Sequence, residues 1–142
     1  MTDYSVISRY RNKIQCELLV EALRARGKSC YNFCEVPADP NNPDASPDDQ
    51  MRAVESDNQF YDDPHLQRVF KRDLDGLKNA EQIILLLPAG TSAHIEAGIA
   101  YGLGKPLILI GEPEKAESLY LIFQERYPSV EAFLATINSG VS

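Results

Sequence analysis

The sequence predicts an α/β protein with a doubly wound parallel sheet of about five strands and helices on both faces. Short apolar segments alternate with helical patterns along the whole chain. Residues 83–87 and 106–110 are continuous apolar runs, which are typical of strands buried on both faces of a parallel sheet. The 142 residues correspond to one domain, and they contain no internal repeat, so we expect a single domain over residues 1–142.

The first half of the chain predicts two strands around one helix. Residues 4–8 and 29–33 are short β-rich segments that we expect to be strands. Between them, residues 13–26 carry apolar side chains at helical spacing, and Gly27 follows as a typical helix end.

The second half predicts further helices and strands in alternation. Pro64 suits the first turn of a helix, and Gly104 suits the end of one. Residues 119–123 form either a last short strand or part of a helix. The predicted elements are a helix over 64–79, a strand over 83–87, a helix over 93–103, a strand over 106–110 and a terminal helix from 129.

Residues 35–63 differ from the rest of the chain in composition. They hold four prolines, nine acidic side chains and only one basic side chain, Arg52. The chain as a whole has a formal charge of −7, so its acidity is concentrated in this segment. We expect an acidic loop, which is either a lid over a site or a solvated connection.

Charge and hydropathy exclude several classes of partner. A net charge of −7 argues against binding to nucleic acid polymers or to an anionic membrane surface. No apolar run is long enough to span a membrane, and residues 1–4 lack the pattern of a secretion signal. Three cysteines do not make a disulfide framework, and both histidines are distant from the Cys30–Cys34 pair. We therefore expect a cytoplasmic protein without a bound metal.

In open parallel sheets, ligands bind beyond the carboxyl ends of the strands. The first predicted strand leads into Ser8, Arg9, Tyr10 and Arg11. The arginines could hold a phosphate and Tyr10 could stack on a base, or the arginines are simply solvated on a loop.

The turn after the strand at 83–87 is the most informative, because it leads directly into a helix. Gly90 allows a ligand to approach the backbone, and the free amides of the helix start favour an anion. Thr91 or Ser92 is expected to cap the helix. The same positive helix end is expected to keep Glu96 ionised, as a nucleophile or a base requires. The alternative is that Glu96 is an ordinary acid of the first turn.

These residues resemble the nucleoside 2-deoxyribosyltransferase family, which includes deoxynucleoside 5'-monophosphate N-glycosidases. The resemblance rests on residues 72–77 (RDLDGL), 90–100 (GTSAHIEAGIA) and 104–106 (GKP). It extends to residues 8–12 (SRYRN) and covers most of the chain, with the acidic segment and the tail matching least.

The resemblance implies a flavodoxin-like sheet, cleavage of the bond between a nucleobase and deoxyribose, and no cofactor. Glu96 matches the nucleophilic glutamate of the family, and Asp73 matches an aspartate that holds or protonates the base. Thr91 and Ser92 match hydroxyls that bind the 5'-phosphate, and His94 either adds a phosphate contact or packs on the helix. The family also implies a homodimer in which the neighbour completes the site.

The sequence departs from the family pattern at two places. Gly90 stands where the transferases carry an aspartate, which favours a phosphorylated substrate over free nucleosides. A first-strand tyrosine that contacts the glutamate in the family falls on Ser5 or on Tyr4 here, depending on register. Two other functions stay open: a non-catalytic nucleotide-binding sensor or regulatory module, and an N-glycosidase acting on a nicotinamide dinucleotide.

Overall fold

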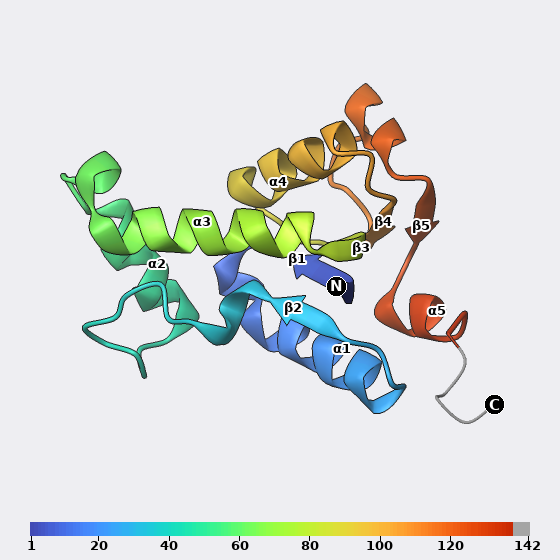
Figure 1. Ribbon diagram of the computed structural model, residues 1–142, viewed down its shortest axis with the longest axis horizontal. Helices are drawn as coiled ribbons and strands as arrows, with labels where there is room; N and C mark the ends of the chain where they lie inside the picture. The colour runs from blue at the N-terminus through green and yellow to red at the C-terminus, as the bar shows by residue number, and fades with distance from the viewer. Residues whose placement is uncertain (138–142) are drawn as a thin grey trace.

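A computed structural model describes residues 1–137 and shows one five-stranded sheet in which all neighbouring strands are parallel (Figure 1). The strands are β1 (Thr2–Ile7), β2 (Cys30–Asn32), β3 (Ala80–Leu86), β4 (Leu107–Ile110) and β5 (Glu125–Tyr127). Their order is β2-β1-β3-β4-β5, which is the flavodoxin-like order. The predicted fold class is confirmed.

Helices cover both faces of this sheet. They are α1 (Lys13–Ala25), α2 (Pro47–Glu55), α3 (Pro64–Lys78), α4 (Thr91–Gly102) and α5 (Val130–Leu134). Helices α3 and α4 lie on one side of the sheet, and α1 and α5 lie on the other (Figure 1). No helix in the described part of the chain is long and apolar enough to cross a membrane.

The strand side chains alternate between two cores. Tyr4 and Val6 of β1 pack with α1 and α5, whereas Ile7 packs with α3 and α4. In β3, the odd-numbered Ile83 and the even-numbered Ile84 likewise belong to opposite cores, and both are fully buried. Burial on both faces explains why residues 83–86 of this strand are apolar at every position.

The prediction of a continuous loop over residues 35–63 is wrong in part, because the segment contains helix α2. The Ser46 hydroxyl caps this helix by accepting a hydrogen bond from the Asp49 amide at 3.1 Å, and Pro47 stands in its first turn. Gln50 is buried, and its side-chain amide bonds the Asp39 N–H and the Asn42 carbonyl. Polar contacts thus order the segment, which explains its lack of apolar periodicity.

The end of the sheet also differs from the sequence prediction. Residues 118–122 form a 3-10 helix, so the helical alternative for this region is the correct one. The edge strand β5 was not predicted, because two of its three residues are exposed and carry no apolar pattern. The terminal helix α5 follows Ser129, whose hydroxyl accepts from the Ala132 amide at 3.1 Å.

Candidate active site

The loops that follow β1 and β3 form one continuous edge, which we call the site rim (residues 8–12 and 88–96). Strand order reverses between β1 and β3, and this switch point is where ligands bind in open α/β sheets. The two loops are in contact range, since a Cβ atom placed on Gly90 would lie 3.7 Å from the Cβ atom of Arg9. The residues predicted after these two strands are therefore brought together.

The buried Ser8 side chain links the two loops of the site rim by hydrogen bonds. Its buried hydroxyl donates to the Leu86 carbonyl at 2.7 Å, lies 3.0 Å from the Pro88 carbonyl and accepts from the Asn12 side-chain amide at 3.2 Å. The hydrogen-bonding capacity of this hydroxyl is used within the protein. Ser8 therefore holds the shape of the rim in this structure.

The rest of the first loop carries two arginines, and among the described residues Arg11 is ion-paired and Arg9 is not. Tyr10 is only 8% exposed, and the Lys13 ammonium lies 5.6 Å from its ring centre, so the ring offers no open face to a base. Arg11 donates from Nε to Asp48 at 2.6 Å and from Nη1 to Glu55 at 2.8 Å. Arg9 is exposed and forms no ion pair within residues 1–137.

Helix α4 starts at Thr91, with Gly90 as the residue before it. The expected cap by Thr91 or Ser92 is wrong, because no side chain caps this helix. Both hydroxyls are exposed beside the first amides of the helix. His94 holds the turn, since Nδ1 donates to the Gly90 carbonyl at 2.7 Å and Nε2 lies 2.8 Å from the Tyr120 hydroxyl. Both ring nitrogens of His94 are thus already engaged.

Two half-buried carboxyl groups, Asp73 on α3 and Glu96 on α4, are close enough for the charge of one to affect the pKa of the other. Burial and, to a smaller extent, the negative charge of Asp73 together raise the pKa of Glu96 to about 8. Burial also raises the pKa of Asp73, while a hydrogen bond from Tyr31 and the charge of Arg72 act in the opposite direction. Glu96 forms no ion pair and accepts no hydrogen bond from the described residues, so its carboxyl group is free to meet a ligand.

The raised pKa of Glu96 disagrees with the expectation that this carboxyl group stays ionised at neutral pH. Glu96 is the sixth residue of α4, and the stabilising effect of a helix end fades beyond the first turn. Burial and the neighbouring Asp73 therefore outweigh the helix end. The two carboxyl groups form a pair that retains a proton at neutral pH.

Tyr31 is a component of this site that the sequence analysis missed. Its hydroxyl donates to Oδ1 of Asp73 at 2.8 Å. Tyr31 pairs with Ser5 in the sheet, and both lie on the face covered by α3 and α4. Tyr4 faces the opposite core, where its ring meets Phe133 at 6.0 Å, so Ser5 rather than Tyr4 faces the carboxyl groups. The only sequence signal for Tyr31 is its place in the predicted strand at residues 29–33.

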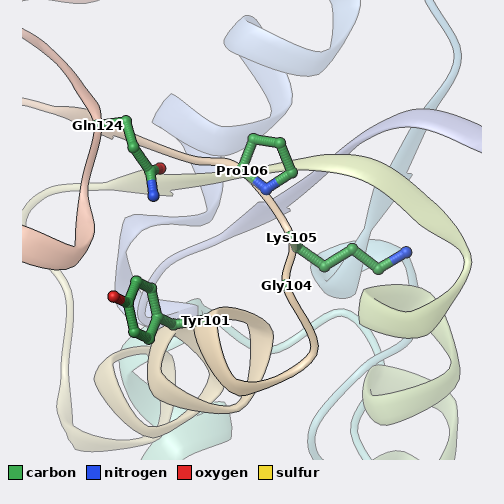
Figure 2. A pocket seen from close by; sticks show the side chains of 5 residues that line it. All are labelled: Tyr101, Gly104, Lys105, Pro106 and Gln124. Carbon is green, nitrogen blue, oxygen red and sulfur yellow. The ribbon is translucent and has the colours of Figure 1, made fainter.

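Two cavities lie away from the carboxyl pair. A cavity of about 550 Å³ is found at the amino ends of β4 and β5, opposite the site rim, and Figure 2 shows its lining by Tyr101, Gly104, Lys105, Pro106 and Gln124. The Lys105 ammonium is bound at 2.8 Å to the carbonyls of Lys78 and Ala80. A second cavity of about 290 Å³ lies at the carboxyl ends of β4 and β5. Within residues 1–137, no three His, Cys, Asp or Glu side chains cluster as metal ligands would.

A flavodoxin-like sheet with a carboxyl pair beside its switch point defines an α/β protein with a candidate active site at the carboxyl ends of its strands. No family model matches the sequence, and no curated protein matches it either.

Solved structures do match. The chain is similar to a 2-deoxyribosyltransferase from the psychrotolerant bacterium Bacillus psychrosaccharolyticus, with a TM-score of 0.61, 17% identity and 96% of each chain covered. It is also similar to the CMP N-glycosidase BcmB of Clostridium botulinum, with a TM-score of 0.56, 17% identity, and 94% of this chain and 96% of that chain covered. At this identity the likeness shows a shared fold. The two structures are of the same kinds of enzyme that the sequence motifs resemble.

Proposed function

We propose that the protein is an N-glycosidase or deoxyribosyltransferase-like enzyme that cleaves the base–sugar bond of a deoxynucleoside 5'-monophosphate or a related nucleoside. Glu96 is the nucleophile and Asp73 is the acid. The observation that carries this proposal is the half-buried carboxyl pair, set on two neighbouring helices beside the switch point of the sheet. The likeness in fold to a deoxyribosyltransferase and a CMP N-glycosidase supports it.

The protonation of the pair suits this chemistry. Two interacting carboxyl groups lose their protons in two steps that belong to the pair, and the pKa of about 8 at Glu96 corresponds to the loss of the last proton. Below that pH the pair holds one proton. The reactive form is the one with this proton on Asp73 and with Glu96 charged, because a nucleophile needs a free electron pair and a leaving base needs a proton.

The reaction follows the logic of retaining glycosidases. An oxygen of Glu96 attacks C1' of the sugar, and the C1'–nitrogen bond breaks with its electron pair going to the base. Asp73 gives its proton to the departing base. Water then attacks C1', the bond to Glu96 breaks, and Asp73 takes the proton that the water loses. When a second base replaces water, the same steps transfer the sugar.

The start of α4 supplies the place for a 5'-phosphate. Exposed hydroxyls of Thr91 and Ser92 and the unpaired amides of the first helical turn lie there, next to the cation of Arg9. Helix starts bind phosphate through such amides. Gly90 adds no negative charge to this place, which favours a phosphorylated substrate.

The protein acts as a homodimer through the outer side of α4. Ile95 and Leu103 lie on this side and are each about half exposed, although their side chains are large and apolar. Exposed apolar surface of this kind commonly marks an interface. Sedimentation velocity tests this assignment: we expect a dimer for the wild type and a monomer for Ile95→Glu, and a wild-type monomer at working concentration contradicts it.

The decisive experiment is an assay for free base. The protein is incubated with a panel of deoxynucleosides, ribonucleosides, their 5'-monophosphates and a nicotinamide dinucleotide. We expect base release from the wild type and its loss in Glu96→Ala and Asp73→Asn. Asp75→Asn is the matched control, because Asp75 lies on the same helix as Asp73, is exposed and pairs with Lys71. Full activity of Glu96→Ala removes the proposed nucleophile, and tight nucleotide binding without turnover favours a binding module.

A further inference from the structure

The Tyr31 hydroxyl and Oδ1 of Asp73 form a 2.8 Å contact between β2 and α3. We propose that Tyr31 is a positioning residue that holds Asp73 by Oδ1 and thereby makes Oδ2 the oxygen that delivers the proton to the departing base. This inference rests on the proposed function, because it assigns how the acid of that reaction is aimed.

Packing places the Tyr31 ring where its hydroxyl can reach Asp73. A Cβ atom placed on Gly76 would lie 2.6 Å from Cδ1 and 2.8 Å from Cε1 of this ring, so only a glycine admits the ring at that depth. Gly76 is three residues after Asp73, and residues at this spacing share a helix face. The ring therefore lies along one turn of α3 and directs its hydroxyl at the carboxyl group.

The neighbouring strand leaves room for the ring. Ser5 pairs with Tyr31 in the sheet and presents a small side chain to the same face. Ser5 is fully buried, and its hydroxyl has no hydrogen-bond partner within the described residues. Tyr31 is thus the strand residue that makes a polar contact with α3 at this point of the site.

The contact determines which oxygen of Asp73 carries the proton. Whenever Asp73 is protonated, a phenol that donates to Oδ1 favours the carboxyl proton on Oδ2, because a protonated oxygen is the poorer acceptor. Burial and the charge of Asp73 raise the pKa of Tyr31, which therefore remains a hydrogen-bond donor at neutral pH. The groups that act on Asp73 are Tyr31 from β2, Arg72 from α3 and Glu96 from α4.

The hydrogen bond also affects how readily Asp73 releases its proton. Donation by Tyr31 stabilises the charged carboxylate and lowers the pKa of Asp73 against the effect of burial. Without this donor, Asp73 retains its proton more strongly and its carboxyl group rotates freely. Protonation of the leaving base requires an acid that is oriented toward the base and has a pKa near the working pH.

Tyr31→Phe tests the proposal, with Tyr127→Phe as the matched control. The Tyr127 hydroxyl donates to Glu125 at 2.9 Å, so the control removes the same type of bond at another place. The first measurement is a ¹³C NMR titration of the side-chain carboxyl groups, which needs no substrate. We expect the pKa of Asp73 to rise in Tyr31→Phe and to stay at the wild-type value in Tyr127→Phe. An unchanged pKa of Asp73 in Tyr31→Phe overturns the proposal.

The second measurement compares leaving groups. One substrate is the best nucleotide of the panel, and the other is the same nucleotide with a base that leaves without protonation, such as an N7-methylated purine. We expect Tyr31→Phe to lower kcat about tenfold or more for the ordinary base, with KM nearly unchanged, and to leave kcat for the activated base close to wild type. A general structural defect lowers both rates alike, and equal losses overturn the proposal.

Failure of the proposed function gives a different pattern. If the wild type releases no base from any nucleotide, the glycosidase assignment is contradicted, and with it the proton delivery proposed for Asp73. If the wild type is active while Tyr31→Phe keeps both its rates and the Asp73 pKa, the positioning role alone is contradicted.

Discussion

The ring of Tyr31 lies against the backbone of Gly76, so that a side chain at position 76 would meet ring atoms at 2.6 to 3.0 Å. This relationship connects the packing of the sheet with the chemistry of the site. The ring that Gly76 admits carries the hydroxyl that binds Asp73. A glycine within a helix normally lowers stability. Here the glycine permits a close contact between α3 and the Tyr31 side chain of β2.

Gly76→Ala is expected to destabilise the protein although alanine is the better helix former. The added methyl group collides with the Tyr31 ring, and overpacking of this kind costs about 1–3 kcal/mol, which exceeds the helix-propensity gain of about 1 kcal/mol. The measurement is the free energy of unfolding from urea denaturation. Gly98→Ala is the control: no atom lies within 4 Å of its added Cβ, so this variant is expected to gain stability. Equal gains in both variants contradict the packing argument.

Glu96→Gln is expected to change how stability depends on pH. The pKa of Glu96 is about 8 in the folded protein and 4.5 ordinarily, so the folded state binds more protons between these values. The contribution of Glu96 to the free energy of unfolding is fully present below about pH 4.5. It is lost as the pH rises toward 8, by at most about 1.4 kcal/mol per pH unit.

Thermal or urea unfolding between pH 5 and 9 measures this effect. Glu96→Gln should lose less stability than the wild type as the pH rises, because glutamine does not titrate. Glu81→Gln, at an exposed position on β3, is the control and should follow the wild-type curve. A wild-type curve parallel to that of Glu96→Gln shows that the Glu96 pKa is not raised.

The rate of base release is expected to fall above about pH 8. The proposed reaction needs one proton in the Asp73–Glu96 pair, and the last proton is lost near that pH. The measurement is kcat/KM between pH 5 and 10, which reports groups of the free enzyme. A rate that rises or stays constant through pH 8 and up to pH 10 contradicts the assignment of a proton to the pair.

Local apolar patterns predicted most of the fold. Residues 83–86 of β3 and all of β4 are buried on both faces and are therefore apolar at every position, so the sequence alone identifies these strands. The edge strand β5 exposes two of its three residues and carries no such pattern. Helix α2 was missed for a related reason: its anchoring side chain, Gln50, is polar and bonds backbone groups of a preceding turn.

The site was predictable only where its residues belong to local motifs. Asp73 and Glu96 stand in recognisable segments of α3 and α4, so both were singled out. Tyr31 reaches Asp73 across 42 residues of sequence, and its position depends on a glycine in another element. The ionisation of Glu96 was mispredicted because the helix end is a local feature, whereas burial and the charge of Asp73 come from the tertiary structure.

Arg11 connects the acidic segment to the site rim, and its removal is expected to release α2. Its guanidinium binds Asp48 and Glu55, which lie at the two ends of α2 and are 37 and 44 residues away in sequence. In Arg11→Gln, the amides of residues 47–55 should exchange with deuterium several-fold faster, because the ion pairs that join the helix to the first loop are lost. Arg52→Gln is the control, since within residues 1–137 Arg52 pairs only with Asp48 and Asp49 of its own helix. Added salt should also speed the exchange of these amides in the wild type, because salt screens exposed ion pairs. It should have little further effect on exchange in Arg11→Gln, which lacks the two pairs. Equal exchange rates in Arg11→Gln and the wild type show that other contacts, such as those of Gln50, suffice to hold α2 in place.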